Sequence, residues 1–155
     1  MYWYWILSAG LVILAASLHA LGAVRFQLDL PWTVWVVAGL VLLNGGWMAF
    51  DGGRALIVGD FVTPKSGRHA GALGPWARIP EALGVSPRST VVRVTFLLYG
   101  CAYLLAVFGL LAGARFAWSV LLSIAVLGFW YVPFGLLINM VVVALLLGPL
   151  RELSP

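Results

Sequence analysis

The sequence predicts an all-α integral membrane protein, and three observations lead to that fold class. Of its 155 residues, 63% are hydrophobic and only 9% are charged, whereas soluble domains are about 25% charged. The mean hydropathy of +1.06 leaves too little polar surface to cover a water-soluble fold. Several uncharged stretches have the roughly 20-residue length of a helix that crosses a bilayer, and most of the polar residues lie between them, in residues 51–93.

The expected architecture is a single transmembrane domain, residues 1–155, built as a four-transmembrane-helix bundle. A long cytoplasmic loop that contains Pro and Gly, residues 51–87, separates helices 2 and 3. The spans are expected at about residues 2–24, 31–50, 88–113 and 116–149.

The first uncharged stretch, residues 1–24, favours a retained span over a cleaved signal peptide. It has no Lys or Arg near its start, and it is longer than the apolar region of about 7–15 residues that signal peptides carry. The Tyr and Trp residues at positions 2–5 are typical of a membrane interface. We therefore expect this segment to cross the bilayer.

The second stretch begins at Pro31, which suits the first position of a helix because its missing amide hydrogen has no partner there. Trp32 and Trp47 mark the two expected interfaces. Gly52 and Gly53 follow, and we expect them to end or loosen this helix just beyond the bilayer.

The polar loop is expected to contain one or two interfacial turns over residues 75–83. Trp76, Ile79 and Leu83 would face lipid from these turns. Ser86 then has the residue type and the following proline expected of an N-cap, so the third span is predicted to begin there.

The third span ends in the pattern Gly109-x-x-x-Gly113, which is a helix-contact motif. The last uncharged run, residues 116–150, would be about 52 Å long as one helix, against a hydrocarbon core of about 30 Å. One tilted or kinked helix gives four spans, which is the main expectation. Two short helices folded back at Pro133 give five, an alternative favoured by the interfacial appearance of Trp130 and Tyr131.

Charge placement predicts the orientation. Six of the nine Lys and Arg residues lie in residues 51–93, which places this loop and the amino terminus on the cytoplasmic side of the inner membrane. The expected partners are the lipid bilayer, anionic lipid headgroups, and either further copies of the chain or a larger membrane complex. The basic residues form no dense run, so nucleic acid is not expected as a partner.

Several chemistries lack their usual residues in this sequence. The uncharged runs contain no Asp, Glu, Lys or Arg, which disfavours ion-coupled transport. No catalytic Ser/His/Asp order, zinc spacing or nucleotide-binding glycine pattern is present. Cys101 is the only cysteine, so no disulfide forms within the chain. We expect no cofactor or metal, and the absence of these motifs makes an enzyme the less favoured class of protein.

Two groups of polar residues remain as candidate sites. Asn44 and Asn139 are expected at similar depth in the membrane, where they would either bond two helices together or line a pore. His19 is a lone imidazole in the first span, for which packing is a simpler role than ligation. Candidates for headgroup or partner contact share a place in the polar loop: Asp51, Arg54, Asp60, Lys65, Arg68, Trp76 and Arg78.

The main functional expectation is a non-enzymatic accessory or scaffold protein that docks partners or anionic lipids through this loop. One alternative is a small oligomeric channel or facilitator lined by the two asparagines. Another is an interfacial lipid-modifying enzyme that uses Asp51 and Asp60. The simplest alternative is a structural role, in which the charges of the loop only fix the depth and orientation of the chain in the bilayer.

Overall fold

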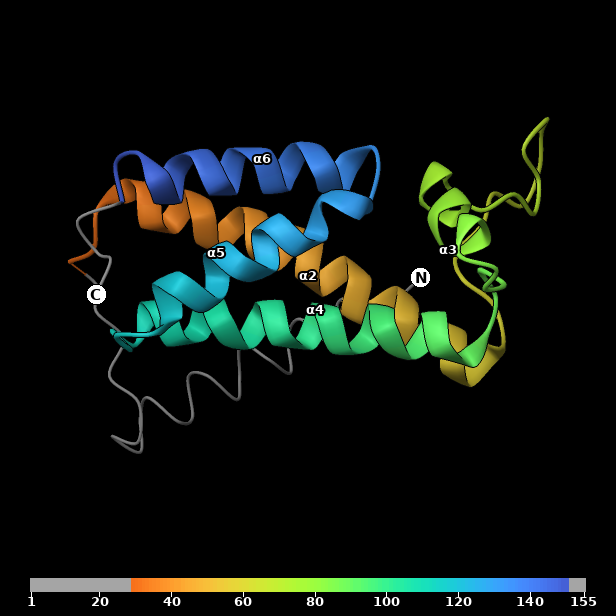
Figure 1. Ribbon diagram of the computed structural model, residues 1–155, viewed down its shortest axis with the longest axis horizontal. Coiled ribbons are helices and arrows are strands. Elements are labelled where there is room, and N and C mark those ends of the chain that lie inside the picture. The colour runs from red at the N-terminus through yellow and green to blue at the C-terminus, as the bar shows by residue number, and fades with distance from the viewer. Residues whose placement is uncertain (1–28, 151–155) are drawn as a thin grey trace.

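The computed structural model describes residues 29–150, and every regular element in that range is a helix. Two long helices, α2 (Trp32–Val58) and α4 (Thr90–Leu111), run antiparallel and make the most extensive helix contact of this part of the chain (Figure 1). Both are long and apolar enough to cross a membrane. The expected span at 2–24, with His19 in it, lies outside the described residues.

Glycines set the close crossing of α2 and α4. A Cβ on Gly100 of α4 would collide with the backbone of Gly45 and Ala49, and one on Gly52 would collide with the backbone at Leu97. Small residues of this kind let helix backbones approach closely in membranes. Of the predicted contact motif, Gly109 lies within α4, and a Cβ there would meet the Cβ of Ala117 on the following helix at 3.3 Å. Gly113 lies beyond the end of α4 and forms a turn with φ of 72°.

The prediction that α2 ends near Gly52 and Gly53 is wrong. The helix continues to Val58 and ends at Gly59, which has φ of 93° and donates its backbone N–H to the carbonyl of Ala55. Gly52 is tolerated inside the helix because it is the surface on which α4 packs. The connection to α4 therefore begins at Gly59, later than the 51–87 loop expected from the sequence.

This connection contains a short 3₁₀ helix, η1 (Pro75–Ala77), which runs directly into α3 (Arg78–Ala82). The predicted turns near residues 75–83 are thus present, and Ile79 and Leu83 are exposed. The start of α4 differs from the prediction. Ser89, and not Ser86, is the N-cap, and its hydroxyl oxygen accepts a hydrogen bond from the Val92 backbone N–H.

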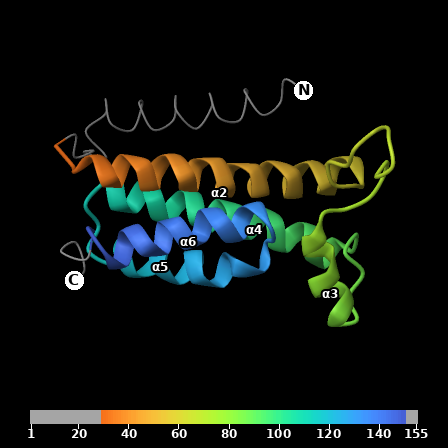
Figure 2. The same ribbon diagram turned by 90° about the horizontal axis from the view of Figure 1, so that it is seen from above.

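The last apolar run is two helices, so the prediction of one helix over 116–149 is wrong and the alternative break at Pro133 is observed. Helix α5 (Ala117–Leu127) continues as the 3₁₀ turn η2 (Gly128–Trp130), and α6 (Phe134–Leu147) returns antiparallel to it (Figure 2). The Trp118 indole donates to the Leu146 carbonyl across this hairpin.

The hairpin has a physical cause in two residues. Pro133 has no amide hydrogen to continue the helix of α5. Gly128 lies directly against the Tyr99 hydroxyl and the Asn139 amide, so a side chain there would not fit. In both views the hairpin lies along α2 and α4, and its tip ends short of α3 (Figures 1 and 2).

Candidate functional site

The centre of the bundle holds a polar cluster that joins its helices. The Asn44 side-chain amide donates to the Asn139 side-chain oxygen at 3.2 Å, and the Tyr103 hydroxyl donates to the same oxygen at 2.9 Å. The Tyr99 hydroxyl donates to the Ile124 carbonyl at 2.5 Å. The two asparagines therefore meet as the sequence predicted, and the cluster connects α2, α4, α5 and α6.

This cluster is buried, and Asn44 is its one member that also lines the cavity beside it. Asn139 and Tyr103 have no exposed surface, and Asn44 is 3% exposed. Buried polar groups that bond one another hold helices in register, since separating them leaves unpaired donors and acceptors. The geometry favours this packing role for the asparagines over the lining of a pore.

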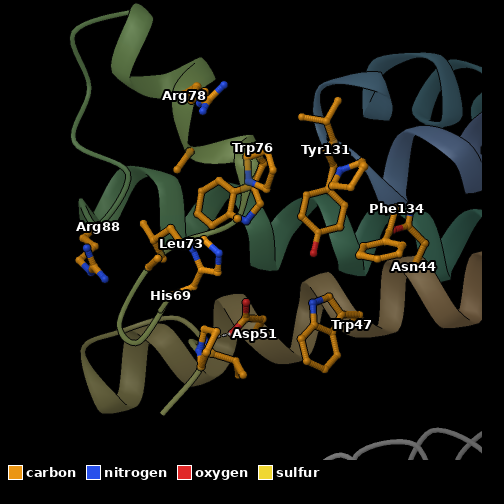
Figure 3. A pocket seen from close by; sticks show the side chains of 18 of the residues that line it. Asn44, Trp47, Asp51, His69, Leu73, Trp76, Arg78, Arg88, Tyr131 and Phe134 are labelled. Atoms are coloured by element: carbon orange, nitrogen blue, oxygen red, sulfur yellow. Dashed lines mark hydrogen bonds between the residues drawn. The ribbon is translucent and has the colours of Figure 1, made fainter. Parts of the chain in front are cut away.

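An open cavity of about 1000 Å³ lies next to the cluster, between α2, the hairpin tip and the 59–89 connection (Figure 3). Its apolar wall comes from α2 and the hairpin: Leu43, Val132, Pro133, Phe134 and Ile138. Its charged and imidazole groups come from α2 and the connection: Asp51, His69, Arg78, Glu81 and Arg88. Asn44 of α2 and apolar residues of the connection, among them Val62 and Leu73, line it as well. The rings of Trp47, Trp76 and Tyr131 line the space between these two sides.

Aromatic packing holds the hairpin tip and the connection together. The ring of Phe96 on α4 is the centre of the group, with ring centroids 4.6 Å from Trp76, 4.9 Å from Phe61, 5.3 Å from Trp130 and 5.6 Å from Tyr131. Aromatic contacts at such distances are favourable beyond the area that they bury. Trp76 is only 6% exposed, so the prediction that it faces lipid is wrong.

Asp51 lies in the wall of the cavity. Its residue is 4% exposed, and its Oδ1 accepts a hydrogen bond of 2.7 Å from the Val62 backbone N–H. The carboxylate is directed into the space between His69, Trp47 and Tyr131 (Figure 3). The indole of Trp47 and the hydroxyl of Tyr131 point toward one another across the same space (Figure 3).

Three other charged residues, Arg54, Asp60 and Arg88, hold the connection against the end of α2. Arg54 donates to the Asp60 carbonyl at 2.7 Å, and Arg88 forms an ion pair of 2.9 Å with the Asp60 carboxylate. Arg88 also donates to the Gly71 carbonyl at 2.8 Å. Asp51 and Arg54 lie three residues apart on α2 but form no ion pair, and each binds backbone of the connection instead.

Asp60 is electrostatically stabilised as a carboxylate. Partial burial acts to raise the pKa of its carboxyl, but the hydrogen bond from Arg88, the backbone N–H of Phe61 and the charges of Arg88 and Arg93 outweigh it. The pKa of Asp60 therefore lies below its ordinary value. Of the residues expected to contact headgroups, Arg54 and Asp60 are thus already engaged within the protein.

The other predicted contact residues divide into two sets. Asp51, Trp76 and Arg78 line the cavity, whereas Lys65 and Arg68 are exposed on the connection and are not among its lining residues.

Sequence reasoning did not identify Trp47, Tyr131, His69 and Arg88 as lining one space. The only available signal was the aromatic pair at Trp130 and Tyr131, which marked the hairpin turn but not the cavity beside it.

Comparison of the chain with protein-family models, with curated proteins and with solved structures finds no match.

Proposed function

We propose that the protein is a non-enzymatic integral membrane protein of the cytoplasmic membrane that binds one amphiphilic molecule in this cavity. The observation that carries the proposal is that the hairpin side of the cavity has no charged lining residue, whereas the connection side contributes His69, Arg78, Glu81 and Arg88. Its volume of about 1000 Å³ is at the upper end of ordinary ligand sites. A lipid head with part of its acyl chain matches both the size and this distribution of charge.

The depth of the cavity supports this proposal. Asp51 follows Trp32 by 19 residues on the same helix, which is a rise of about 28 Å. Trp32 is 73% exposed, as expected of an interfacial aromatic residue. If Trp32 marks one boundary of a hydrocarbon core of about 30 Å, Asp51 lies at the opposite boundary, where lipid heads and tails meet.

The two sides of the cavity suit the two parts of a phospholipid. Leu43 and Phe134 are 55% and 75% exposed, so they contact acyl chains of the surrounding bilayer and continue that apolar surface into the cavity. Arg78 and His69 at the other side are exposed and bear donors suited to a phosphate. Phosphate-bearing lipids are therefore the expected ligands.

The topology that we propose has α2 and α4 crossing the membrane and α5–α6 entering and leaving it on one side. The 11 residues of α5 and the 14 of α6 rise about 16 and 21 Å, which is less than the hydrocarbon thickness. A hairpin that ends within the membrane is tolerated where its turn is buried in protein or lines a cavity. Here the turn packs on Phe96 and lines the cavity.

Labelling of single cysteines tests this topology. In a Cys101→Ser background, a membrane-impermeant maleimide is applied to intact cells and to inverted vesicles that carry Ser66→Cys, Ala114→Cys or Pro149→Cys. We expect positions 114 and 149 to label from the same side, and position 66 from the other, cytoplasmic side. Labelling of position 149 together with position 66 would contradict the re-entrant hairpin, because the chain would then cross the membrane once after α4.

Native mass spectrometry of the protein released from nanodiscs tests lipid binding. We expect the wild type to retain one phosphatidylglycerol molecule, and Arg78→Gln to lower its retention about fivefold, since a partly exposed charged contact is worth about 1 kcal/mol. Arg68→Gln is the matched control, because Arg68 is a loop arginine outside the cavity. Equal losses in both variants would indicate general surface charge and not this site.

A further inference from the structure

The carboxylate of Asp51 is buried without an ion-pair partner. Among residues 29–150 the ion pair is Arg88 with Asp60, and no basic side chain reaches Asp51 within 4 Å. Arg54, one turn further along α2, instead donates to the Asp60 carbonyl. A buried charge without a partner is costly, so a cation that entered the cavity would gain a strong contact with this carboxylate.

The surroundings of Asp51 suit one class of cation. Trp47, Trp76 and Tyr131 line the same cavity and converge on the space above the carboxylate (Figure 3). Aromatic rings attract ammonium groups through the negative potential of their faces, most strongly in Trp. A carboxylate beside aromatic rings therefore provides both a charge partner and an apolar surround for an amine.

A metal ion fits the same place less well. No group of three or more His, Cys, Asp and Glu side chains in the described part of the chain is arranged to hold one. Hard divalent cations take about six oxygen ligands, whereas an ammonium group needs one carboxylate and accepts the rings as its remaining contacts.

We propose that Asp51 binds the ammonium group of a zwitterionic phospholipid head. The aromatic rings of Trp47, Trp76 and Tyr131 surround the amine, and the phosphate of the same head lies toward Arg78. This assignment rests on the proposed function and names the ligand class within it: a phospholipid that carries an amine is selected over one that does not.

The test compares two lipids that differ in the head only. Phosphatidylethanolamine and phosphatidylglycerol with identical acyl chains are mixed in equal amounts in nanodiscs with the full chain, and native mass spectrometry measures which is retained. We expect the wild type to prefer phosphatidylethanolamine about tenfold. Asp51→Asn should abolish the preference, and its amide oxygen keeps the acceptor for the Val62 N–H. A folded Asp51→Asn protein with the wild-type preference would overturn the assignment.

Two further variants keep the result specific. Glu81→Gln removes an exposed carboxylate from the edge of the same cavity, and it should leave the preference unchanged. Loss of the preference in Glu81→Gln as well would overturn the role of Asp51, because any negative charge would then suffice. Trp47→Leu removes one ring of the surround, and should reduce the preference about threefold. If Asp51→Asn does not fold, this variant decides the assignment, and an unchanged preference in it would overturn the assignment.

The outcomes separate the two proposals. If the wild type retains neither lipid, the cavity does not bind phospholipid and the proposed function itself fails. If the wild type retains both lipids equally, the proposed function stands and only the assignment of the amine to Asp51 fails. A preference for phosphatidylglycerol would also overturn the assignment and would support a site for anionic heads.

Discussion

Asn44 and Asp51 lie on the same face of α2, seven residues apart, and are almost equally buried at 3% and 4% exposure. Their surroundings differ. Both residues line the cavity, but the Asn44 side chain bonds the side chain of Asn139, whereas Asp51 accepts a hydrogen bond from one backbone N–H. Equal burial thus accompanies two different states. A polar group bonded to a side chain of another helix holds the fold, and a carboxylate with a single backbone partner at the cavity is available to a ligand.

The length of the α5–α6 hairpin explains the difference. Asn139 lies in the second turn of α6, where it still reaches Asn44, but α6 begins only at Phe134. Beyond that point α2 continues for several turns without a hairpin beside it, and the 59–89 connection covers it from the other end of the molecule (Figures 1 and 2). The cavity is the space that neither segment fills.

Separating α2 from α4 should have the largest effect, because both polar sites depend on that crossing. We expect Gly100→Ala to destabilise the protein by about 3 kcal/mol, since the added methyl would meet backbone atoms of α2 that cannot move independently. Gly46→Ala, where a Cβ meets nothing within 4 Å, should be neutral or slightly stabilising. Thermal unfolding in detergent, followed by circular dichroism, measures both; equal stability of the two variants would contradict the close approach of the two helices at Gly100.

The next effect tests the hydrogen bond of Asn44 to Asn139. Asn139→Leu should cost about 2 kcal/mol, because it leaves Asn44 and the hydroxyl of Tyr103 without their partner in the core. Lipid retention should stay the same, since Asn139 does not line the cavity. Met140→Leu, at the exposed neighbouring position, is the control for the same unfolding measurement. A loss of lipid with no loss of stability would show that the cluster belongs to the binding site.

Asp51→Asn should change lipid binding without lowering the stability of the protein. Removal of an unpaired buried charge, with the acceptor for Val62 retained, should leave the unfolding free energy unchanged or raise it by up to about 1 kcal/mol. Chemical denaturation of the lipid-free protein measures this change. A loss of stability comparable to that of Asn139→Leu would place Asp51 among the structural polar groups and would remove the contrast between the two positions.

The smallest effect is expected at the ion pair that folds the connection. Asp60→Asn should cost about 0.5 kcal/mol, because Asp60 and Arg88 are both nearly half exposed. The pKa of Asp60 is lowered in the folded protein, so its contribution is complete above the unfolded pKa of about 4 and is lost as the pH falls through the lower folded pKa. Stability measured from pH 6 downward should therefore fall less in Asp60→Asn than in the wild type, and parallel curves would contradict this role.

The sequence alone determined those features that depend on local composition and spacing. Long apolar runs without charge predicted the membrane-type helices at α2 and α4, since hydropathy and helix length are properties of each segment by itself. Pro133 indicated where the last run can break, because a proline in the interior of a helix removes a backbone hydrogen bond and clashes with the preceding turn. The polarity of Asn44 and Asn139 inside apolar runs marked them as candidates to bond two helices together, although the single span 116–149 assumed for Asn139 is in fact two helices.

Only the tertiary structure decided how polar and aromatic residues are used. Gly52 and Gly53 look like a helix end in sequence, but Gly52 lies where α4 packs, and the helix passes through it. Trp76 looks like an interfacial residue, but Phe96 lies close enough to bury it. The charge of Asp51 is available to a ligand because α6 begins at Phe134 and Arg54 turns to Asp60. These outcomes depend on distances between segments far apart in the chain, which no local pattern of residues contains.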